Sequence, residues 1–204
     1  MRKTILAGII VSILGSCGTN IKEAGYDTEA IKQEIQDRKI KRVTESELRD
    51  WIYLKSPEIA SALNKDLVQN ILAEIDNKDF NLEKYIQNYQ SEVKDSLAKT
   101  YMVDIQLLPL IEEEATQWKG KQKEVIEAYL YNKAEKIPLE QNIQKIENGA
   151  FFFTAPVKVL TAIPSDKSTD FTEIKEKLQS EVIWAIVFTK ENTIRTLNVK
   201  ELRK

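Results

Sequence analysis

The sequence PLEQNIQKIENGAFFFTAPVKVLTAI, residues 138–163, decides the fold of this 204-residue chain. Over residues 151–163 apolar side chains occupy alternate positions, with Thr161 the only polar exception, while Thr154 and Lys158 fall between them. The apolar phase consists of Phe151, Phe153, Ala155, Val157, Val159 and Ile163. This period of two predicts a strand with one buried face. Residues 142–146 predict a shorter strand, and Asn148 and Gly149 tolerate the positive φ angles of a type I′ turn. The stretch therefore predicts a β-hairpin.

Two other stretches predict strands of the same antiparallel sheet. Val103, Ile105 and Leu107 alternate with polar residues, which is typical of a strand with one buried face. Residues 182–188 are apolar in both phases, which predicts a central strand covered on both faces. Residues 193–199 are compatible with a last strand at the sheet edge.

Helical patterns precede these strands. Thr44 and Glu47 have the spacing of a capping box, so we expect a folded domain over residues 44–204. Ser56 and Pro57 predict either the start of a new helix or a kink in one long helix. Asn81 opens a further helix, expected to extend to about residue 97 and to pack antiparallel on the helix of residues 59–75. Tyr85 and Tyr89 fall on its apolar stripe, where tyrosines either line a ligand pocket or, more commonly, are core residues with satisfied hydroxyls.

Helical patterns also separate the strands. Residues 112–114 are three glutamates in a row, which favour a solvated helix start over a cation site. A helix is expected over residues 122–135, and Asp170 with Glu173 predicts the cap of a short helix. N-terminal helices followed by an antiparallel sheet with helices packed on it define the expected fold class as α+β.

The first 17 residues carry the parts of a bacterial lipoprotein signal. Arg2 and Lys3 precede an apolar run over residues 5–14, which is too short to span about 30 Å of hydrocarbon as a helix. LGSC, residues 14–17, resembles the lipobox. We expect residues 1–16 to be a cleaved signal peptide and residues 17–43 a tether lipidated at Cys17 and partly helical over residues 28–39. The alternatives are a secretory peptide with an incidental cysteine and, for the tether, a helix that docks on a partner.

The lipid on Cys17 is expected to be the sole membrane anchor. Cys17 is the only cysteine and has no disulfide partner within the chain, which weakens the secretory alternative. No later apolar run approaches the length of a membrane helix. Gly18, rather than Asp, follows the cysteine, which by enterobacterial sorting behaviour implies the periplasmic side of the outer membrane.

The composition excludes several classes of binding, catalytic and metal site. Removal of Arg2 and Lys3 with the signal leaves 28 basic and 32 acidic residues, so nucleic-acid binding is not expected. The chain has no histidine, which excludes Ser-His-Asp and Cys-His catalysis, the common zinc sites and haem ligation through imidazole. Neither glycine-rich phosphate-binding pattern occurs. Ser96 and Lys99 have S-x-x-K spacing but lack the companion motifs of serine acyltransferases. We expect no catalytic residue, no metal and no cofactor.

The order of the sequence segments resembles that of a known family. DSLAKTYMVDIQLLPL, from Asp95, and then QKEVIEAYLYNKAEKIPLEQNIQKIENGAFFFTAPVK, ending at Lys158, are similar to the periplasmic c-type haem sensor-like family, a domain of unknown function. The resemblance covers residues 44–190 and implies a helical N-terminal portion followed by a PAS-like antiparallel sheet. In that family a C-x-x-C-H motif follows the long strand, but LTAIPSDKSTD, residues 160–170, has neither cysteine nor histidine. The family's upstream cysteine also has no counterpart in residues 85–93, so the haem site is expected to be lost.

Two functions of different classes follow. The first is a non-catalytic, membrane-anchored sensor or binding lipoprotein that faces the periplasm and takes a small apolar molecule. The second is a structural or interaction module that binds an envelope protein and has no ligand. A pocket would lie between the sheet and the helix of residues 122–135; its expected lining residues are Trp118, Tyr129, Phe151, Phe153 and Trp184. A plain hydrophobic core explains the same residues.

Overall fold

The computed structural model describes residues 29, 31–35, 43–159 and 168–197. The chain divides into two compact units, Met1–Lys41 and Arg42–Lys204. In the first unit the described residues are helical, as expected within residues 28–39. The predicted signal peptide, Cys17 and most of the tether lie outside the described residues.

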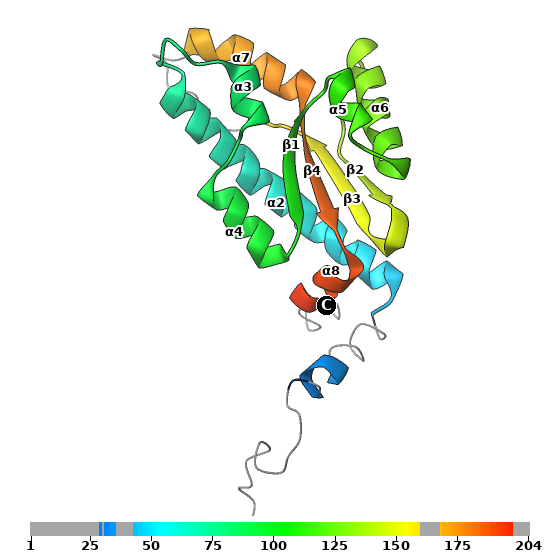
Figure 1. Cartoon of the computed structure of the whole chain (residues 1–204). Coiled ribbons are helices and arrows are strands. Elements are labelled where there is room, and N and C mark those ends of the chain that lie inside the picture. Colours follow the sequence, from blue (N-terminus) through cyan, green and yellow to red (C-terminus); the bar gives the residue numbers. More distant parts are fainter. Residues whose placement is uncertain (1–28, 30, 36–42, 160–167, 198–204) are drawn as a thin grey trace, which may run out of the picture. The chain divides into compact units, whose positions relative to one another are not determined.

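The second unit is an α+β structure: helices come first, and a four-stranded antiparallel sheet with helices packed on it follows (Figure 1). This confirms the fold class expected from the sequence. The elements in chain order are α2 (Glu45–Glu74), α3 (Leu82–Gln87), α4 (Glu92–Tyr101), β1 (Asp104–Pro109), α5 (Glu112–Thr116), α6 (Gly120–Ala134), β2 (Asn142–Lys145), β3 (Phe151–Pro156), α7 (Ser168–Glu181), β4 (Val182–Phe188) and α8 (Lys190–Thr196). No helix among the described residues is long and apolar enough to cross a membrane.

The strands lie in the order β1-β4-β3-β2, and every neighbouring pair is antiparallel. β4 lies between β1 and β3, and only Val187 among its residues is not fully buried. This confirms the central strand predicted from residues 182–188. In β1, Ile105 and Leu107 are buried and Asp104 is exposed, in agreement with the predicted alternation.

The hairpin of β2 and β3 turns at the predicted residues. Asn148 has φ 59° and ψ 21°, and Gly149 has φ 68°. The Ala150 amide donates to the Glu147 carbonyl at 3.3 Å, which closes the turn. The positive φ angles expected at the Asn-Gly pair are therefore confirmed.

The prediction for the second hairpin strand is wrong in two respects. Every residue of β3 is buried, so the strand has two covered faces and not one. It also ends at Pro156: residues 157–159 are not strand, and residues 160–163 lie outside the described part. Thr154 misled the prediction because it is polar but fully buried, and its hydroxyl donates to the Tyr129 hydroxyl at 3.1 Å.

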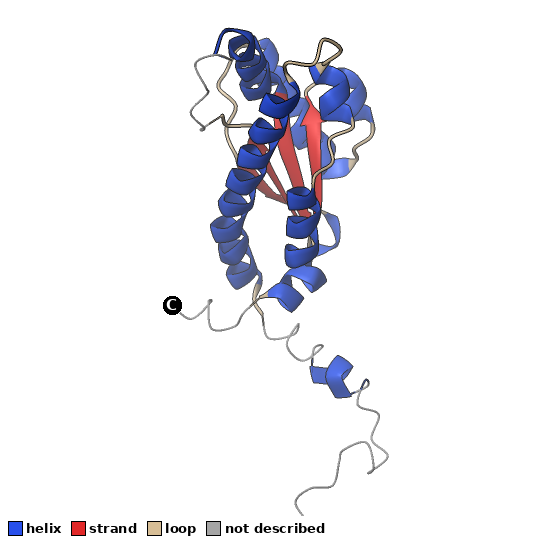
Figure 2. Ribbon diagram, turned by 90° about the vertical axis from the view of Figure 1, so that its left-hand side faces the viewer, coloured by secondary structure: helices blue, strands red, loops and turns tan. Residues whose placement is uncertain are grey.

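Each face of the sheet has its own core, and Figure 2 shows helices on both sides of the sheet. On the first face, here called the α6 face, the buried cluster contains Tyr129 of α6 together with Phe152 and Ala185. On the opposite face, the α2 face, the ring of Trp51 meets Phe188 edge-on at 6.5 Å. Successive residues of a strand point to opposite faces, so β3 and β4 supply both cores.

Residues 45–74 form one continuous helix, α2, with Pro57 inside it. Thr44 and Glu47 form the predicted capping box: the Thr44 hydroxyl accepts from the Glu47 amide at 3.2 Å, and the Thr44 amide donates to the Glu47 carboxylate at 2.8 Å. Ser56 is not an N-cap, because its buried hydroxyl donates back to the Ile52 carbonyl. Of the two alternatives at Pro57, the single long helix is therefore correct.

Three other helix predictions need correction. The helix expected over residues 81–97 is two helices, α3 and α4, because Ser91 caps a new helix by accepting from the Lys94 amide at 3.0 Å. α7 starts at least two residues before the expected cap at Asp170. The edge strand expected from residue 193 is the helix α8, whose N-cap Thr189 accepts from the Asn192 amide at 3.3 Å.

Candidate functional site

The five residues expected to line a pocket are divided between the two faces of the sheet. Trp118 and Tyr129 lie on the α6 face, where the Trp118 ring packs at 5.3 Å from Phe152. Phe151, Phe153 and Trp184 project toward the α2 face, and all three are at least 97% buried. The five side chains therefore do not line one pocket, and those of β3 and β4 are core residues.

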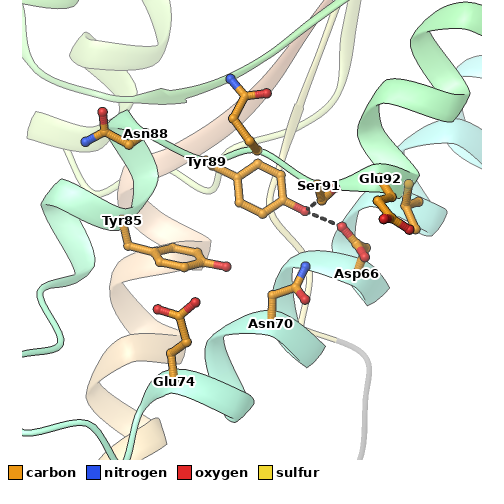
Figure 3. Close-up of a pocket in the computed structure, with 10 residues that line it drawn as sticks. Asp66, Asn70, Glu74, Tyr85, Asn88, Tyr89, Ser91 and Glu92 are labelled. Atoms are coloured by element: carbon orange, nitrogen blue, oxygen red, sulfur yellow. Dashed lines mark hydrogen bonds between the residues drawn. The ribbon is translucent and has the colours of Figure 1, made fainter.

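A cleft of about 520 Å³ lies elsewhere, where the end of α2 meets α3 and the connection to α4. We call it the tyrosine cleft, after Tyr85 of α3 and Tyr89 of the connection (Figure 3). Its other lining residues are Asp66, Asn70 and Glu74 of α2, Asn88, Gln90 and Ser91 of the connection, and Glu92 and Val93 of α4. Glu74, Asn88 and Glu92 are exposed, so the cleft is open to solvent.

Helical spacing brings the α2 side chains of the cleft together. Asp66, Asn70 and Glu74 follow one another at intervals of four residues, which places them on one stripe of the helix. Figure 3 shows the hydroxyls of Tyr85 and Tyr89 pointing toward this stripe. One wall of the cleft, from α2, thus carries carboxylates and an amide, and the other, from α3 and the connection after it, carries the two aromatic rings.

Tyr89 connects the cleft to the core. Its hydroxyl donates to Asp66 Oδ2, and Ser91 Oγ lies 3.2 Å from the hydroxyl oxygen. The Tyr89 ring meets the fully buried ring of Trp184 at 5.8 Å in an edge arrangement. Trp184 Nε1 in turn donates to Asn64 Oδ1 of α2 at 2.9 Å. These contacts fix the position of Tyr89.

The acidic residues of the lining act on the pKa of both tyrosines. Burial raises the pKa of Tyr85 to about 12, and the carboxylates of Glu74 and Asp66 add to the rise. Burial and the hydrogen bond to Asp66 likewise raise the pKa of Tyr89. Both phenols are neutral at pH 7, so they offer ring faces and hydroxyl groups and no additional charge.

No basic side chain lines the cleft, and Asp66, Glu74 and Glu92 form no ion pair within the described residues. The ammonium group of Lys94 lies beside it but is held by the Tyr89 carbonyl and Gln90 Oε1, each at 3.2 Å. The three carboxylates are therefore left without a cationic partner from the described protein.

The cleft is suited to binding and not to catalysis by its tyrosines. A phenol with a raised pKa is a weak general base and a weak nucleophile at neutral pH. Within the described residues no group of acidic side chains is arranged to hold a metal ion. The arrangement can recognise a ligand through hydrogen bonds, ring faces and negative charge.

A second concavity, of about 540 Å³, lies between the segment after α6 and the end of α7. We call it the Ile137 groove; its lining includes Ile137, Pro138, Leu139, Gln179 and Ser180. Ile137, which is 45% exposed, lies beside Pro138 and Leu139, so the lining of this groove is more apolar than that of the tyrosine cleft.

The haem of the resembling family does not fit the residues present. The chain has no histidine, and Cys17 is its only cysteine. The region between the sheet and α6, where a ligand pocket was expected, is filled by Trp118, Tyr129 and Phe152. No residue is therefore assigned to haem.

Comparisons of the chain with models of protein families, with curated proteins and with solved structures give no match.

The sequence pattern placed Tyr85 and Tyr89 on the apolar stripe of one long helix and favoured core positions for them over a ligand pocket, so the tyrosine cleft was not the predicted site. A signal was available: Ser91 is a preferred N-cap residue, and Glu92 and Asp95 in the next turn favour a helix start there. A helix break at Ser91 removes Tyr89 from the stripe and exposes its hydroxyl to α2.

Proposed function

We propose that this chain is a lipid-anchored, non-catalytic binding protein of the bacterial cell envelope that holds a small molecule in the tyrosine cleft. The single observation that carries the proposal is the cleft itself, about 520 Å³ in volume, in which two tyrosine rings and the Asp66 stripe converge. Pockets of this size that combine ring faces with a few placed polar groups are the usual form of small-molecule sites. The polar lining favours a polar ligand over the apolar one expected from the sequence.

Two further observations support the rest of the proposal. The sequence LGSC at residues 14–17 supports acylation of Cys17, and Gly18 after it supports an anchor at the periplasmic side of the outer membrane. The order of helices followed by an antiparallel sheet agrees with a sensor-like, PAS-like scaffold that has lost its haem.

Native mass spectrometry of the full-length protein, purified in mild detergent from its own cells, tests the binding function. We expect a bound small molecule in the parent protein and its loss in Tyr85→Leu, with Leu54→Ala, an exposed position on α2, as the matched control. A protein that carries no small molecule in any preparation would contradict the proposal.

Membrane fractionation tests the anchor. Replacement of Cys17 by Ala removes the acylated atom, so the variant is expected in the aqueous phase of a detergent partition while the parent enters the detergent phase. A Cys17→Ala variant that still enters the detergent phase would refute the lipid anchor.

The second candidate, an interaction module for another envelope protein, is favoured by the Ile137 groove. Ile137 and Tyr131, which is 62% exposed, offer apolar surface near each other along the chain. Under this alternative Ile137→Glu abolishes co-purification of a partner, and Tyr85→Leu leaves it unchanged.

A further inference from the structure

We propose that the ligand of the tyrosine cleft is an organic cation, a small molecule that carries at least one ammonium group. This inference rests on the binding function proposed above and adds the chemical class of the ligand. The tyrosine cleft is lined by the half-buried ring of Tyr85, by Tyr89, which is 5% exposed, and by three carboxylates.

The charges of the lining favour a cation. Asp66, Glu74 and Glu92 face the cleft, and no lysine or arginine is among the lining residues. An anionic ligand would meet three like charges, and a neutral one would leave them unpaired. A cation offsets the repulsion between the carboxylates, and because Glu74 and Glu92 are exposed this attraction is weakened by salt.

The rings select an organic cation over a metal ion. The centroids of Tyr85 and Tyr89 are 6.0 Å apart, and the two rings are inclined at 55° to each other. Ring faces attract an ammonium group within about 6 Å of the centroid, and they contact the carbon substituents of that group as well. Hard metal ions bind several oxygen atoms and gain little from a ring. Among the described residues no acidic cluster has the arrangement of a metal site.

One ammonium group of the protein itself already lies at the edge of the cleft. Lys94 Nζ donates to the Tyr89 carbonyl and to Gln90 Oε1 at its edge, so acceptors of this connection are directed at a cation. Tyr89 itself is held in place by Asp66 and by the ring of Trp184. The aromatic wall is therefore preorganised, which lowers the entropy lost on binding.

Isothermal titration calorimetry of the full acylated chain in nonionic detergent tests the inference. The probes are choline, spermidine and the uncharged carbon analogue of choline, in which a quaternary carbon replaces the nitrogen. At least one of the two cations is expected to bind with a Kd below about 1 mM. The uncharged analogue is expected not to bind, and the affinity for the cation falls when NaCl is raised from about 0.05 to 0.5 M.

Paired variants separate the charge from the ring. Glu74→Gln keeps the shape of an exposed side chain and is expected to weaken binding about fivefold. Its control, Glu83→Gln, removes the same charge from an exposed residue of α3 outside the cleft lining and is expected to leave the affinity unchanged. Tyr85→Leu removes the ring face and is expected to weaken binding about tenfold, whereas Tyr85→Phe keeps the face and stays within about twofold.

The outcomes distinguish this inference from the proposed function. If neither cation binds, or if the uncharged analogue binds as well as choline, the organic cation is refuted. If the parent protein then still carries a small molecule that Tyr85→Leu loses, the binding function stands with another ligand class. Equal effects of Glu74→Gln and Glu83→Gln would also overturn the assignment, because the attraction would then not depend on the cleft.

Discussion

Replacement of Asn64 by Ala is expected to destabilise the domain strongly, although the side chain is small. Asn64 is 6% exposed, and its Oδ1 accepts from two donors. One is Trp184 Nε1 at 2.9 Å, and the other is the backbone amide of Lys158 at 3.2 Å. The residue thus joins α2 to the central strand and to the segment that follows β3.

The size of the expected loss in stability follows from the two hydrogen-bond donors that lose their acceptor. A buried donor without an acceptor costs about 1–3 kcal/mol, and Asn64→Ala removes the acceptor of the buried Trp184 Nε1 and of the part-buried Lys158 amide. The better helix propensity of alanine returns about 0.7 kcal/mol at most. We therefore expect the free energy of unfolding to fall by about 2–4 kcal/mol and Tm to fall by about 5–15 °C. Such a loss is a large fraction of the 5–15 kcal/mol typical of a domain.

Urea unfolding followed by far-ultraviolet circular dichroism measures this change, with Gln69→Ala as the control. Gln69 is exposed on the same helix, so its replacement is expected to change the free energy by less than about 0.5 kcal/mol. A double-mutant cycle with Trp184→Phe, which has no indole N–H, is expected to give a coupling energy of about 1–2 kcal/mol. An Asn64→Ala protein within about 0.5 kcal/mol of the parent would refute the role of the hydrogen bonds.

Three other predictions follow from the core and the cleft. Phe153→Asp places a charge without a partner at a position that is 0% exposed, so we expect the free energy of unfolding to fall by more than about 4 kcal/mol, or the variant not to fold, in the same urea assay. A melting temperature within a few degrees of the parent would contradict the register of β3. Tyr129→Phe removes the donor to the Glu140 carbonyl and the acceptor of Thr154 Oγ1, and is expected to cost about 1–2 kcal/mol in thermal unfolding, against no change for Tyr131→Phe at an exposed position. Burial raises the pKa of Tyr85 from 10.0 to about 12, so above pH 10 the folded state binds more protons than the unfolded state, and stability present below pH 10 is lost as the pH rises toward 12. Ultraviolet titration of the parent and of Tyr85→Phe is expected to assign one phenol to a midpoint near 12. A midpoint near 10 would show that the cleft does not change the pKa of Tyr85.

Local rules predicted those parts of the fold where one or two residues decide the backbone. Thr44 and Glu47 satisfy each other's hydrogen bonds within one helical turn, so their pattern does not depend on tertiary structure. Asn148 and Gly149 likewise adopt the conformations that few other residue types tolerate. At these positions sequence and structure agree because the relevant energies are local.

The failures occur where a tertiary contact or a longer helical segment outweighs the local pattern. Thr154 was assigned to a solvent face because it is polar, yet the Tyr129 hydroxyl satisfies it inside the core. Residues 193–199 were interpreted as compatible with a strand at the sheet edge. The Thr189 cap and a bond from Thr193 Oγ1 to the Thr189 carbonyl at 2.7 Å favour the helix instead.

The position of the candidate site also follows from tertiary contacts and not from a local pattern. A sheet whose β3 and β4 are buried on both faces has no room between its layers, so the residues expected to form a pocket form two cores. A binding surface must then arise where an element ends. Ser91 ends the connection after α3 and starts α4, which leaves Tyr89 with its ring against Trp184 and its hydroxyl on Asp66. The rigid core thus holds one wall of the tyrosine cleft without being opened, while the exposed carboxylates of the other wall stay available to a ligand.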